Sequence, residues 1–291
     1  MKSLLRWRAG TVSSSDRKKR KRMITENELL VVSFGTTSAE SRRLNIEYVE
    51  QAIREAAGEE WSVCRCFTSQ TVINIIARKE DIKIDNIAEA LERAAATGVK
   101  NLVVQPTHLM KGIEYDKLCV MLKDQADSFA RVAMGDPLLT SNEDFDRVAD
   151  ALIDAFAGYE DGETAVVLMG HGTEAAANGI YDKMQAAFDS KGKEDYFVGT
   201  VEAKPSLDDV IRDVRRGHYK RVVLRPLMLV AGNHAVNDMA SPDDPDSWYS
   251  RFTAEGYETL CIIEGLGQLP AVRSIYADHA DRAIASLDGQ L

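Results

Sequence analysis

The chain contains the same strand and glycine pattern twice, and this repeat restricts it to folds built from two similar halves. Val31–Thr37 matches Val166–Gly172 at an offset of 135 residues. Val103–Gly112 matches Val223–Gly232 at an offset of 120 residues, and each copy has a proline that is followed six residues later by glycine. The two halves should therefore present strand ends and glycine turns at equivalent places.

Apolar runs of strand length alternate with segments of helical period in both halves. We predict strands at Leu29–Phe34, Trp61–Phe67, Asn101–Gln105, Arg131–Met134, Ala165–Met169, Tyr196–Glu202, Arg221–Leu229 and Thr259–Ile263. We predict helices at Ser41–Ala57, Asp85–Thr97, Glu114–Asp127, Ala175–Phe188, Leu207–Arg215, Trp248–Glu255 and Pro270–Leu287. Strands that alternate with helices form parallel sheets covered on both faces. We therefore expect an α/β protein with two similar parallel-sheet domains, related by the repeat, and an active-site cleft between them.

The expected domains are residues 25–145 and residues 146–291. The second carries the candidate metal ligands, and its last helix could pack back on the first. Residues 1–22 differ, with nine Lys or Arg against one acidic residue, Asp16. We expect residues 1–24 to be a disordered tail, or an extension upstream of a natural start at Met23. Binding of the basic run Lys18–Arg22 to nucleic acid is the alternative.

Charge and hydropathy exclude several classes of partner. The tail contributes +8 to the total of −10, so the rest of the chain carries −18. A body this acidic repels nucleic acid. No stretch in the tail resembles the roughly 7 to 15 apolar residues of a secretory signal, and no run approaches the roughly 20 residues of a membrane span. We expect a cytoplasmic protein with no membrane or nucleic-acid partner.

The four cysteines agree with a reducing compartment. Cys64 and Cys66 are close in sequence and point to one face of a strand, but Cys119 and Cys261 form no second pair with metal-ligand spacing. Buried free thiols are the expected state.

Two of the five histidines lie at the ends of predicted strands, each beside glycine. His171 stands in Met-Gly-His-Gly and His234 in Ala-Gly-Asn-His. Glu202 ends a third predicted strand, and the carboxyl ends of parallel strands form the edge where ligands bind. Two imidazoles and a carboxylate suit a divalent first-row metal and leave coordination positions open. The alternative is that these are loop histidines that cap helices.

Other candidates are less specific. In the repeat, Thr36 aligns with His171 and Glu114 with His234. Glu114 could accept protons or orient a substrate, or it could simply stabilise the first turn of a helix. We expect His108 to pack at a strand end, His218 to be exposed and His279 to be structural. The Gly-His-Gly-Thr string lacks a phosphate-loop or dinucleotide pattern, and no nucleophile motif is present.

Several strings resemble the single-subunit, ATP-independent cobalt chelatases of anaerobic cobalamin synthesis. These enzymes act on sirohydrochlorin and belong to the class II chelatase superfamily, which includes ferrochelatase. The resemblance covers roughly residues 28–285. It rests on Leu30–Thr36, Phe67–Ser69, Met169–Gly172, Leu227–Ala240, Asp246–Trp248 and Gly265–Gly267.

The resemblance implies that His171, Glu202 and His234 bind the metal and that His171, His234 and Glu114 are catalytic. It implies insertion of Co²⁺ into sirohydrochlorin, with release of both pyrrolic protons and without a nucleotide. We expect the substrate to contact glycine turns and neighbouring residues at the strand ends, namely Phe34, Gly35, Thr36, Gly170 and Gly232.

The substrate carboxylates need basic partners, and five residues flank the relevant turns, although surface solvation is the commoner role for each. They are Arg42, Arg43, Lys111, Lys204 and Arg225. Insertion of Fe²⁺ or Ni²⁺ into the same tetrapyrrole is the alternative reaction, because nitrogen and oxygen ligands separate these metals weakly. A non-catalytic metal or tetrapyrrole carrier is the alternative of another class. The sequence leaves homo-oligomer formation open.

Overall fold

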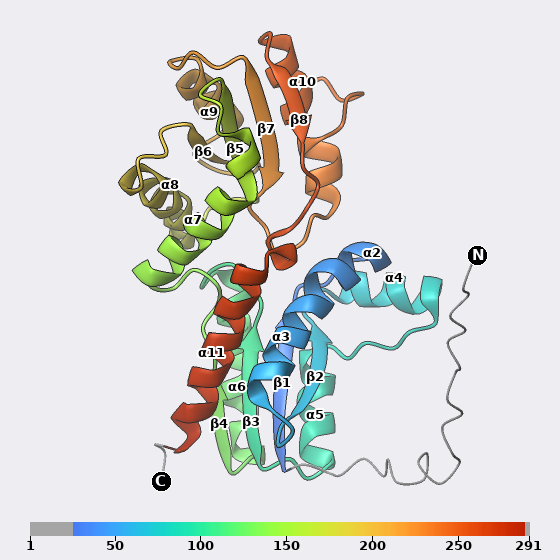
Figure 1. The fold of residues 1–291 in the computed structure, drawn as a ribbon. Helices are drawn as coiled ribbons and strands as arrows, with labels where there is room; N and C mark the ends of the chain where they lie inside the picture. The colour runs from blue at the N-terminus through green and yellow to red at the C-terminus, as the bar shows by residue number, and fades with distance from the viewer. Residues whose placement is uncertain (1–25, 289–291) are drawn as a thin grey trace, which may run out of the picture.

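The computed structural model describes residues 26–288, which form two parallel four-stranded sheets, one above the other (Figure 1). The first sheet has the order β2-β1-β3-β4 and the second β6-β5-β7-β8. The strands are β1 (Asn27–Ser33), β2 (Ser62–Phe67), β3 (Asn101–Pro106), β4 (Arg131–Met134), β5 (Thr164–Gly170), β6 (Tyr196–Thr200), β7 (Arg221–Pro226) and β8 (Glu258–Cys261). All neighbouring strands are parallel. The predicted α/β fold class is confirmed, and the predicted tail lies outside the described residues.

The sheets have equivalent strand orders, but their hydrogen bonds shift the first repeat alignment by two residues. Beyond the strand ends, the Glu202 N–H donates to the His171 carbonyl, and the Ser69 N–H donates to the Phe34 carbonyl. Phe34 therefore occupies the backbone position of His171. The predicted correspondence of Thr36 with His171 is wrong.

The second repeat alignment keeps its register. Pro106 pairs with Val32 in the first sheet, and Pro226 pairs with Met169 in the second. Pro106 and Pro226 are 120 residues apart, as the sequence alignment requires. The same offset places Glu114 at the position that is equivalent to His234 in the other half.

All the predicted helices are present, and residues 26–288 contain two α-helices that were not predicted. The α-helices are α2 (Ala39–Ser41), α3 (Tyr48–Ala57), α4 (Gln70–Glu80), α5 (Ile87–Ala96), α6 (Ile113–Gln125), α7 (Asn142–Phe156), α8 (Ile180–Ser190), α9 (Leu207–Val214), α10 (Trp248–Ala254) and α11 (Pro270–Asp288). The π-helices are η1 (Arg42–Glu47) and η5 (Ala235–Met239), and the 3₁₀ turns are η2 (Ala126–Ser128), η3 (Ala157–Tyr159), η4 (Ala176–Gly179) and η6 (Leu266–Gln268). The additional helices are α4 and α7.

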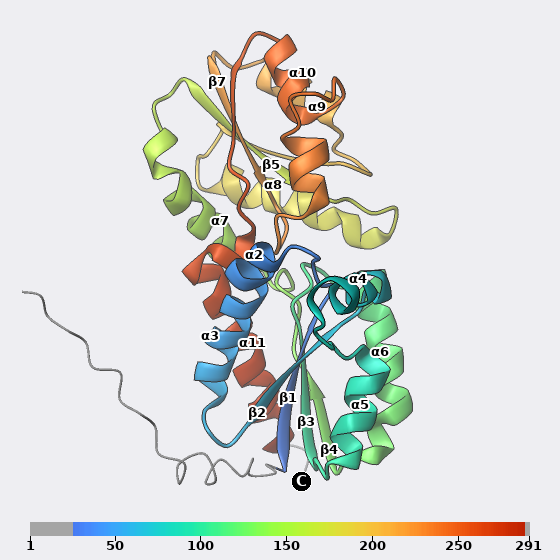
Figure 2. The same cartoon turned by 90° about the vertical axis from the view of Figure 1, so that its right-hand side faces the viewer.

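Helix α7 carries the chain from the first half to the second, and α11 returns it (Figures 1 and 2). A capping box between Ser141 and Asp144 starts α7, because it satisfies backbone N–H groups that lack partners within the helix. Helix α11 packs on α3, β3 and β4 of the first half, and the Tyr276 hydroxyl donates to the Thr107 carbonyl at 2.9 Å. The C-terminal helix thus covers the first sheet.

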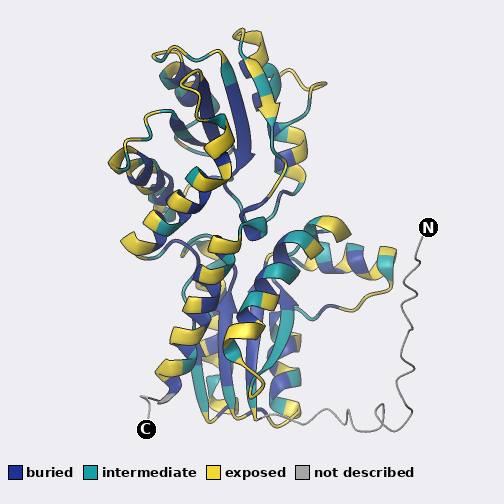
Figure 3. Cartoon of the chain, viewed as in Figure 1, coloured by how far each residue is buried: buried dark blue, intermediate teal, exposed yellow. Residues whose placement is uncertain are grey.

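One hydrophobic cluster includes residues of both halves, and Figure 3 shows that the strands of both sheets are largely buried. It includes Leu29 and Val103 of the first sheet, Val166 and Val223 of the second, and Tyr276 of α11. Because burial of apolar surface is the main favourable term in folding, this shared cluster joins the two halves through packing. In residues 26–288, no helix is long and apolar enough to cross a membrane.

The segments that follow strands in the two halves meet each other. The Ser41 hydroxyl, beyond β1, donates to the Ala231 carbonyl, beyond β7, at 3.1 Å. Leu229 also packs against an apolar cluster of the first half that includes Ile46 and Phe67. The ligand-binding edges expected for parallel α/β sheets are therefore next to each other.

Candidate metal centre

His171 lies directly after β5, in a turn that depends on the glycines beside it. Gly170 is buried, and a Cβ atom there would lie 2.1 Å from the Tyr181 ring. Gly172 has a φ of +88°, a left-handed conformation that favours glycine, and its N–H donates to the Tyr181 hydroxyl at 3.1 Å. The His171 Nδ1–H donates to the Gly172 carbonyl at 3.0 Å. This bond leaves the Nε2 lone pair for a metal.

His234 comes from the segment after β7 and immediately precedes the π-helix η5. Its Nδ1 atom lies 2.6 Å from Oδ2 of Asp238. Because an ionised carboxylate only accepts hydrogen bonds, Nδ1 carries the proton and Nε2 presents its lone pair. Asp238 was not among the predicted site residues. Its position four residues after His234 could have indicated the pairing, because residues four apart lie on one face of a helical turn.

Glu202 lies two residues beyond β6, in a loop and not in the predicted strand. Its N–H donates to the His171 carbonyl at 2.9 Å, which ties the two loops together. Its Oε2 atom lies 3.5 Å from Nδ1 of His171. The side chain therefore reaches the imidazole from a neighbouring strand end.

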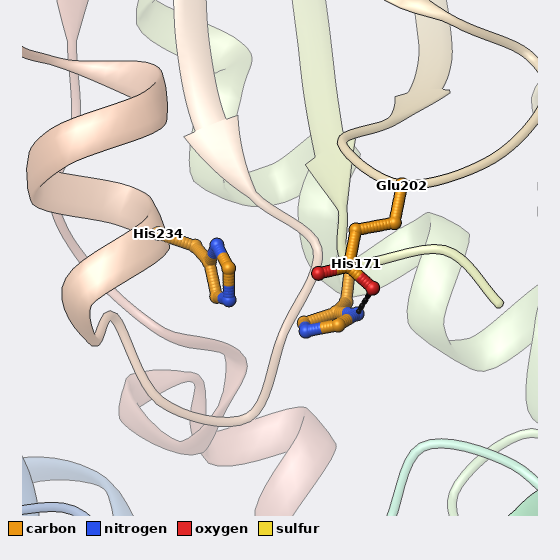
Figure 4. Close-up of side chains that lie close together, drawn as sticks. All are labelled: His171, Glu202 and His234. Atoms are coloured by element: carbon orange, nitrogen blue, oxygen red, sulfur yellow. Dashed lines mark ion pairs between the residues drawn. The ribbon is translucent and has the colours of Figure 1, made fainter.

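These three side chains form one group, shown in Figure 4. Ligand atoms of His171, Glu202 and His234 all lie within 4.8 Å of one another. The two imidazole centroids are 4.6 Å apart and the rings are nearly perpendicular, at 81°. The three side chains are 45%, 54% and 38% exposed, in the order His171, Glu202, His234. The group can therefore bind a divalent cation and keep coordination positions open to a second ligand.

Glu114 is not part of this group. It lies in the first turn of α6, in the half opposite the three ligands, where a carboxylate is favourable to the helix dipole. Its Oε1 atom forms an ion pair with Nζ of Lys117 at 2.7 Å. Gly112, which caps the same helix, is close to Ala177 of the second half. The start of α6 therefore faces the half that carries the candidate metal ligands.

The predicted substrate residues of the first half have distinct environments. Phe34 is 56% exposed at the end of β1, although large apolar side chains are usually buried. Gly35 has a φ of +96° and packs on the Phe67 ring. Thr36 is buried, and its carbonyl accepts a hydrogen bond from Arg42. Exposed Phe34 therefore offers an apolar contact surface at this edge.

The glycines of the second half also differ from each other. Gly170 faces Tyr181, whereas a Cβ atom on Gly232 would meet nothing within 4 Å. Of these two predicted substrate residues, Gly232 is therefore the one with open space beside its backbone.

The candidate basic residues are mostly held by acidic partners. Arg42 and Arg225 are buried, so the expectation that they are solvated at the surface is wrong. Arg42 pairs with Glu80, and Arg225 lies 3.5 Å from Glu264. Lys111 remains exposed and pairs with Asp136. Lys204 is also exposed and pairs with Asp209 at 2.7 Å.

The remaining histidines lie away from the three ligands. Both ring nitrogens of His108 are buried without a hydrogen-bond partner, and burial lowers the pKa of this residue to about 4, against an opposing effect of Glu114. His279 is buried and bonds to Asp144, as expected for a structural residue. His218 is exposed, as predicted.

The chain is similar to known proteins over most of its length. The family model described as cobalt chelatase (CbiK) matches residues 27–285. A Salmonella typhimurium protein named sirohydrochlorin cobaltochelatase is 36% identical over 259 residues, which cover 88% of this chain and 96% of that protein. A Nitratidesulfovibrio vulgaris protein named sirohydrochlorin cobaltochelatase CbiKC is 29% identical, with 91% of this chain and 93% of that protein covered.

Solved structures show a similar fold at low sequence identity. SirB from Bacillus subtilis with Fe³⁺ has a TM-score of 0.57 and 14% identity, with 91% of this chain and 98% of that chain covered. The sirohydrochlorin chelatase SirB from Bacillus subtilis subspecies spizizenii, in complex with cobalt, has a TM-score of 0.55 and 11% identity, with 91% and 97% covered. These likenesses support the two-sheet architecture.

Proposed function

We infer the function from one premise: this chain belongs to the cobalt chelatase (CbiK) family. We propose that it inserts Co²⁺ into sirohydrochlorin, the activity that the names of its curated relatives state. The observation that carries the proposal is the group of His171, Glu202 and His234, with ligand atoms within 4.8 Å of one another. Imidazole and carboxylate donors bind divalent first-row metals, and three protein ligands leave positions for the nitrogens of a macrocycle.

The proposed mechanism follows from the charges. Insertion replaces both pyrrolic N–H protons with a divalent cation, so the protein must hold the cation and accept protons. The Nε2 lone pairs of His171 and His234 hold Co²⁺, and the Glu202 carboxylate offsets part of its charge. As macrocycle nitrogens replace the imidazoles, Nε2 of each histidine becomes available to accept a proton.

Glu114 supplies a proton acceptor from the opposite half. It lies on the helix that faces the metal-binding half, and it has the backbone position that His234 occupies in the other half. A carboxylate on the far side of the macrocycle can accept a pyrrolic proton without competing for the cation. We therefore assign Glu114 to proton transfer or to substrate orientation.

We propose that the macrocycle lies between Phe34 of the first half and the histidines of the second. The exposed Phe34 ring offers an apolar surface for the tetrapyrrole. The Gly35 and Thr36 turn lies beside it, and the backbone at Gly170 and Gly232 lines the opposite side. Open space beside Gly232 accommodates a bulky ligand.

The ligand set does not choose strongly between Co²⁺, Fe²⁺ and Ni²⁺, so we propose that the protein also inserts Fe²⁺ or Ni²⁺ when these are offered alone. We further propose that the reaction needs no nucleotide. A cytoplasmic location is proposed because Cys64, Cys66, Cys119 and Cys261 are all free thiols, the state that a reducing compartment maintains.

The test follows the visible absorption of sirohydrochlorin mixed with Co²⁺, Fe²⁺ or Ni²⁺, with and without ATP. The wild type should accelerate insertion without ATP, and His171→Ala and His234→Ala should abolish the acceleration. His218→Ala, at an exposed histidine of the same half, is the control. If the wild type binds Co²⁺ but the tetrapyrrole spectrum changes no faster than without protein, the protein is a carrier. If both active-site variants match the wild type, the site is wrong.

A further inference from the structure

Lys117 is the immediate partner of Glu114 on α6. The two side chains form an ion pair at 2.7 Å, with Lys117 63% exposed and Glu114 37% exposed. They lie three residues apart, on the same face of the helix. Because Glu114 is assigned to proton transfer or to substrate orientation, a group that binds Lys117 in its place would change how that carboxylate is paired.

The substrate is a polyanion, because the tetrapyrrole carries acetate and propionate side chains around its ring. The metal-binding half presents acidic groups to it, including Glu202 and Asp238 beside the histidines. A nearby cavity of about 260 Å³ adds Asp208, Asp244 and Asp246 to its lining, and the one basic residue of that lining, Arg251, is already paired with Asp208. Cations that recognise the substrate must therefore come mainly from the first half, where α6 begins.

Among the basic residues on this side, Lys117 is the one whose acidic partner is itself assigned to the reaction. Arg42 is buried. Lys111 pairs with Asp136 at 2.8 Å and also lies 5.8 Å from the Tyr115 ring. The Lys117 pair is exposed, and exposed ion pairs contribute little net stability, so a substrate carboxylate can replace Glu114 at low cost.

We propose that Lys117 is a specificity-determining residue that exchanges partners when substrate binds. In the free protein its ammonium group pairs with Glu114. In the complex it pairs with a carboxylate side chain of the tetrapyrrole, and Glu114 is released to accept a pyrrolic proton. Substrate recognition and proton acceptance are thereby coupled through one lysine. This inference rests on the proposed function.

The exchange predicts opposite effects of the two residues on substrate affinity. Lys117→Gln removes the cation and should weaken sirohydrochlorin binding by about tenfold, the size expected for one charge-assisted hydrogen bond. Glu114→Gln removes the competitor for Lys117 and should tighten binding by about threefold, the size of a weak exposed ion pair, while it slows insertion. In a Lys117→Gln background, Glu114→Gln should no longer tighten binding.

The experiment measures sirohydrochlorin binding without metal, by fluorescence quenching, for the wild type, both single variants and the double variant. Lys117→Arg should stay close to the wild type, and Lys123→Gln, at an exposed lysine further along α6, is the charge-matched control. Co²⁺ affinity without tetrapyrrole should be the same in Lys117→Gln and the wild type. The proposal is overturned if Lys117→Gln changes tetrapyrrole affinity no more than Lys123→Gln. An equal effect of Glu114→Gln with and without Lys117 also overturns it.

Failure of the proposed function looks different. A wild-type protein that binds sirohydrochlorin and Co²⁺ but does not insert the metal would remove the chelatase assignment. Such a protein would still give the binding measurements that decide the partner exchange.

Discussion

The imidazole of His234 and the carboxylate of Asp238 are joined by a hydrogen bond of 2.6 Å from Nδ1 to Oδ2. The bond places the proton on Nδ1 and turns Nε2 toward His171. His171 has a weaker anchor, since its Nδ1–H donates to the neutral carbonyl of Gly172 at 3.0 Å. Both histidines are thus held through Nδ1, but by groups of different charge.

We predict that Asp238→Asn weakens Co²⁺ binding by about 10- to 100-fold, because carboxylates that orient a ligating histidine typically contribute this much to metal affinity. The fold should stay stable, since Asp238 is partly exposed and lies outside the hydrophobic core. Isothermal titration with Co²⁺ measures the effect, with Asp243→Asn as an exposed control in the same segment. Equal Co²⁺ affinity in the two variants would show that the hydrogen bond has no role in metal binding.

Phe34 provides the second prediction. It has the backbone position of His171 in the other half and is exposed, so Phe34→Ala removes apolar contact surface without opening a cavity in the core. We expect sirohydrochlorin binding to weaken by about tenfold or more, because burial of an aromatic side chain stabilises by about 1.5–3 kcal/mol. Thermal unfolding should be nearly unchanged. Ile82→Ala, at another exposed apolar residue, should leave tetrapyrrole binding as in the wild type.

Much of the candidate site could be predicted because strand ends determine where it lies. His171, Glu202 and His234 each follow a strand of one sheet, and parallel order brings such positions to one edge. Asp238 was missed although it lies four residues after His234, because no helix was predicted over this segment and the spacing is informative only within a helix. Helix α7 was also missed, although Ser141 and Asp144 carry the spacing of a capping box.

The two-residue error in the repeat has a physical cause. Side chains alternate between the faces of a strand, so a shift by two keeps every buried residue on the buried face. The sequence match aligned Gly35 with Gly170, whereas the hydrogen bonds equate it with Gly172. Only the pairing with neighbouring strands distinguishes these registers, and the hydrophobic pattern alone does not contain that information.

His108 provides a prediction about pH. Burial lowers its pKa from 6.5 to about 4, with Glu114 acting in the opposite direction. The unfolded chain therefore takes up a proton near pH 6.5, while the folded protein resists it until about pH 4. Stability should fall as the pH drops through this window, by about 2 kcal/mol from this residue at pH 5.

The variant for this test is His108→Met, because Met228 has the equivalent position in the second half. Methionine does not titrate, so the difference in unfolding free energy between pH 7 and pH 5 should be smaller in the variant than in the wild type. Urea unfolding at both pH values measures it. If the two proteins lose the same stability, His108 does not remain neutral in the fold.

The last prediction concerns His279 of α11 and Asp144 of α7, which are buried together. Nε2 of His279 lies 2.9 Å from Oδ1 of Asp144, and Nδ1 lies 3.0 Å from the Asp136 carbonyl. Both neighbours are acceptors, so each ring nitrogen lies where it can donate a hydrogen bond. Burial alone would raise the pKa of Asp144, but hydrogen bonds from His279 and Ser141 outweigh it and lower the pKa to about 2.

Replacing one partner of a buried ion pair leaves an uncompensated charge, so His279→Leu should destabilise the fold by about 3–5 kcal/mol. A double variant with Asp144→Asn should recover part of this loss, since the amide is neutral and its oxygen can still accept hydrogen bonds from the start of α7. Because the pKa of Asp144 is lowered in the folded protein, the stability that the pair contributes is present above about pH 3.8 and is lost as the pH falls toward 2. Urea unfolding of the wild type, the single variant and the double variant at pH 7 measures these free energies. A double variant less stable than His279→Leu would show that the destabilisation comes from lost packing and not from the isolated carboxylate.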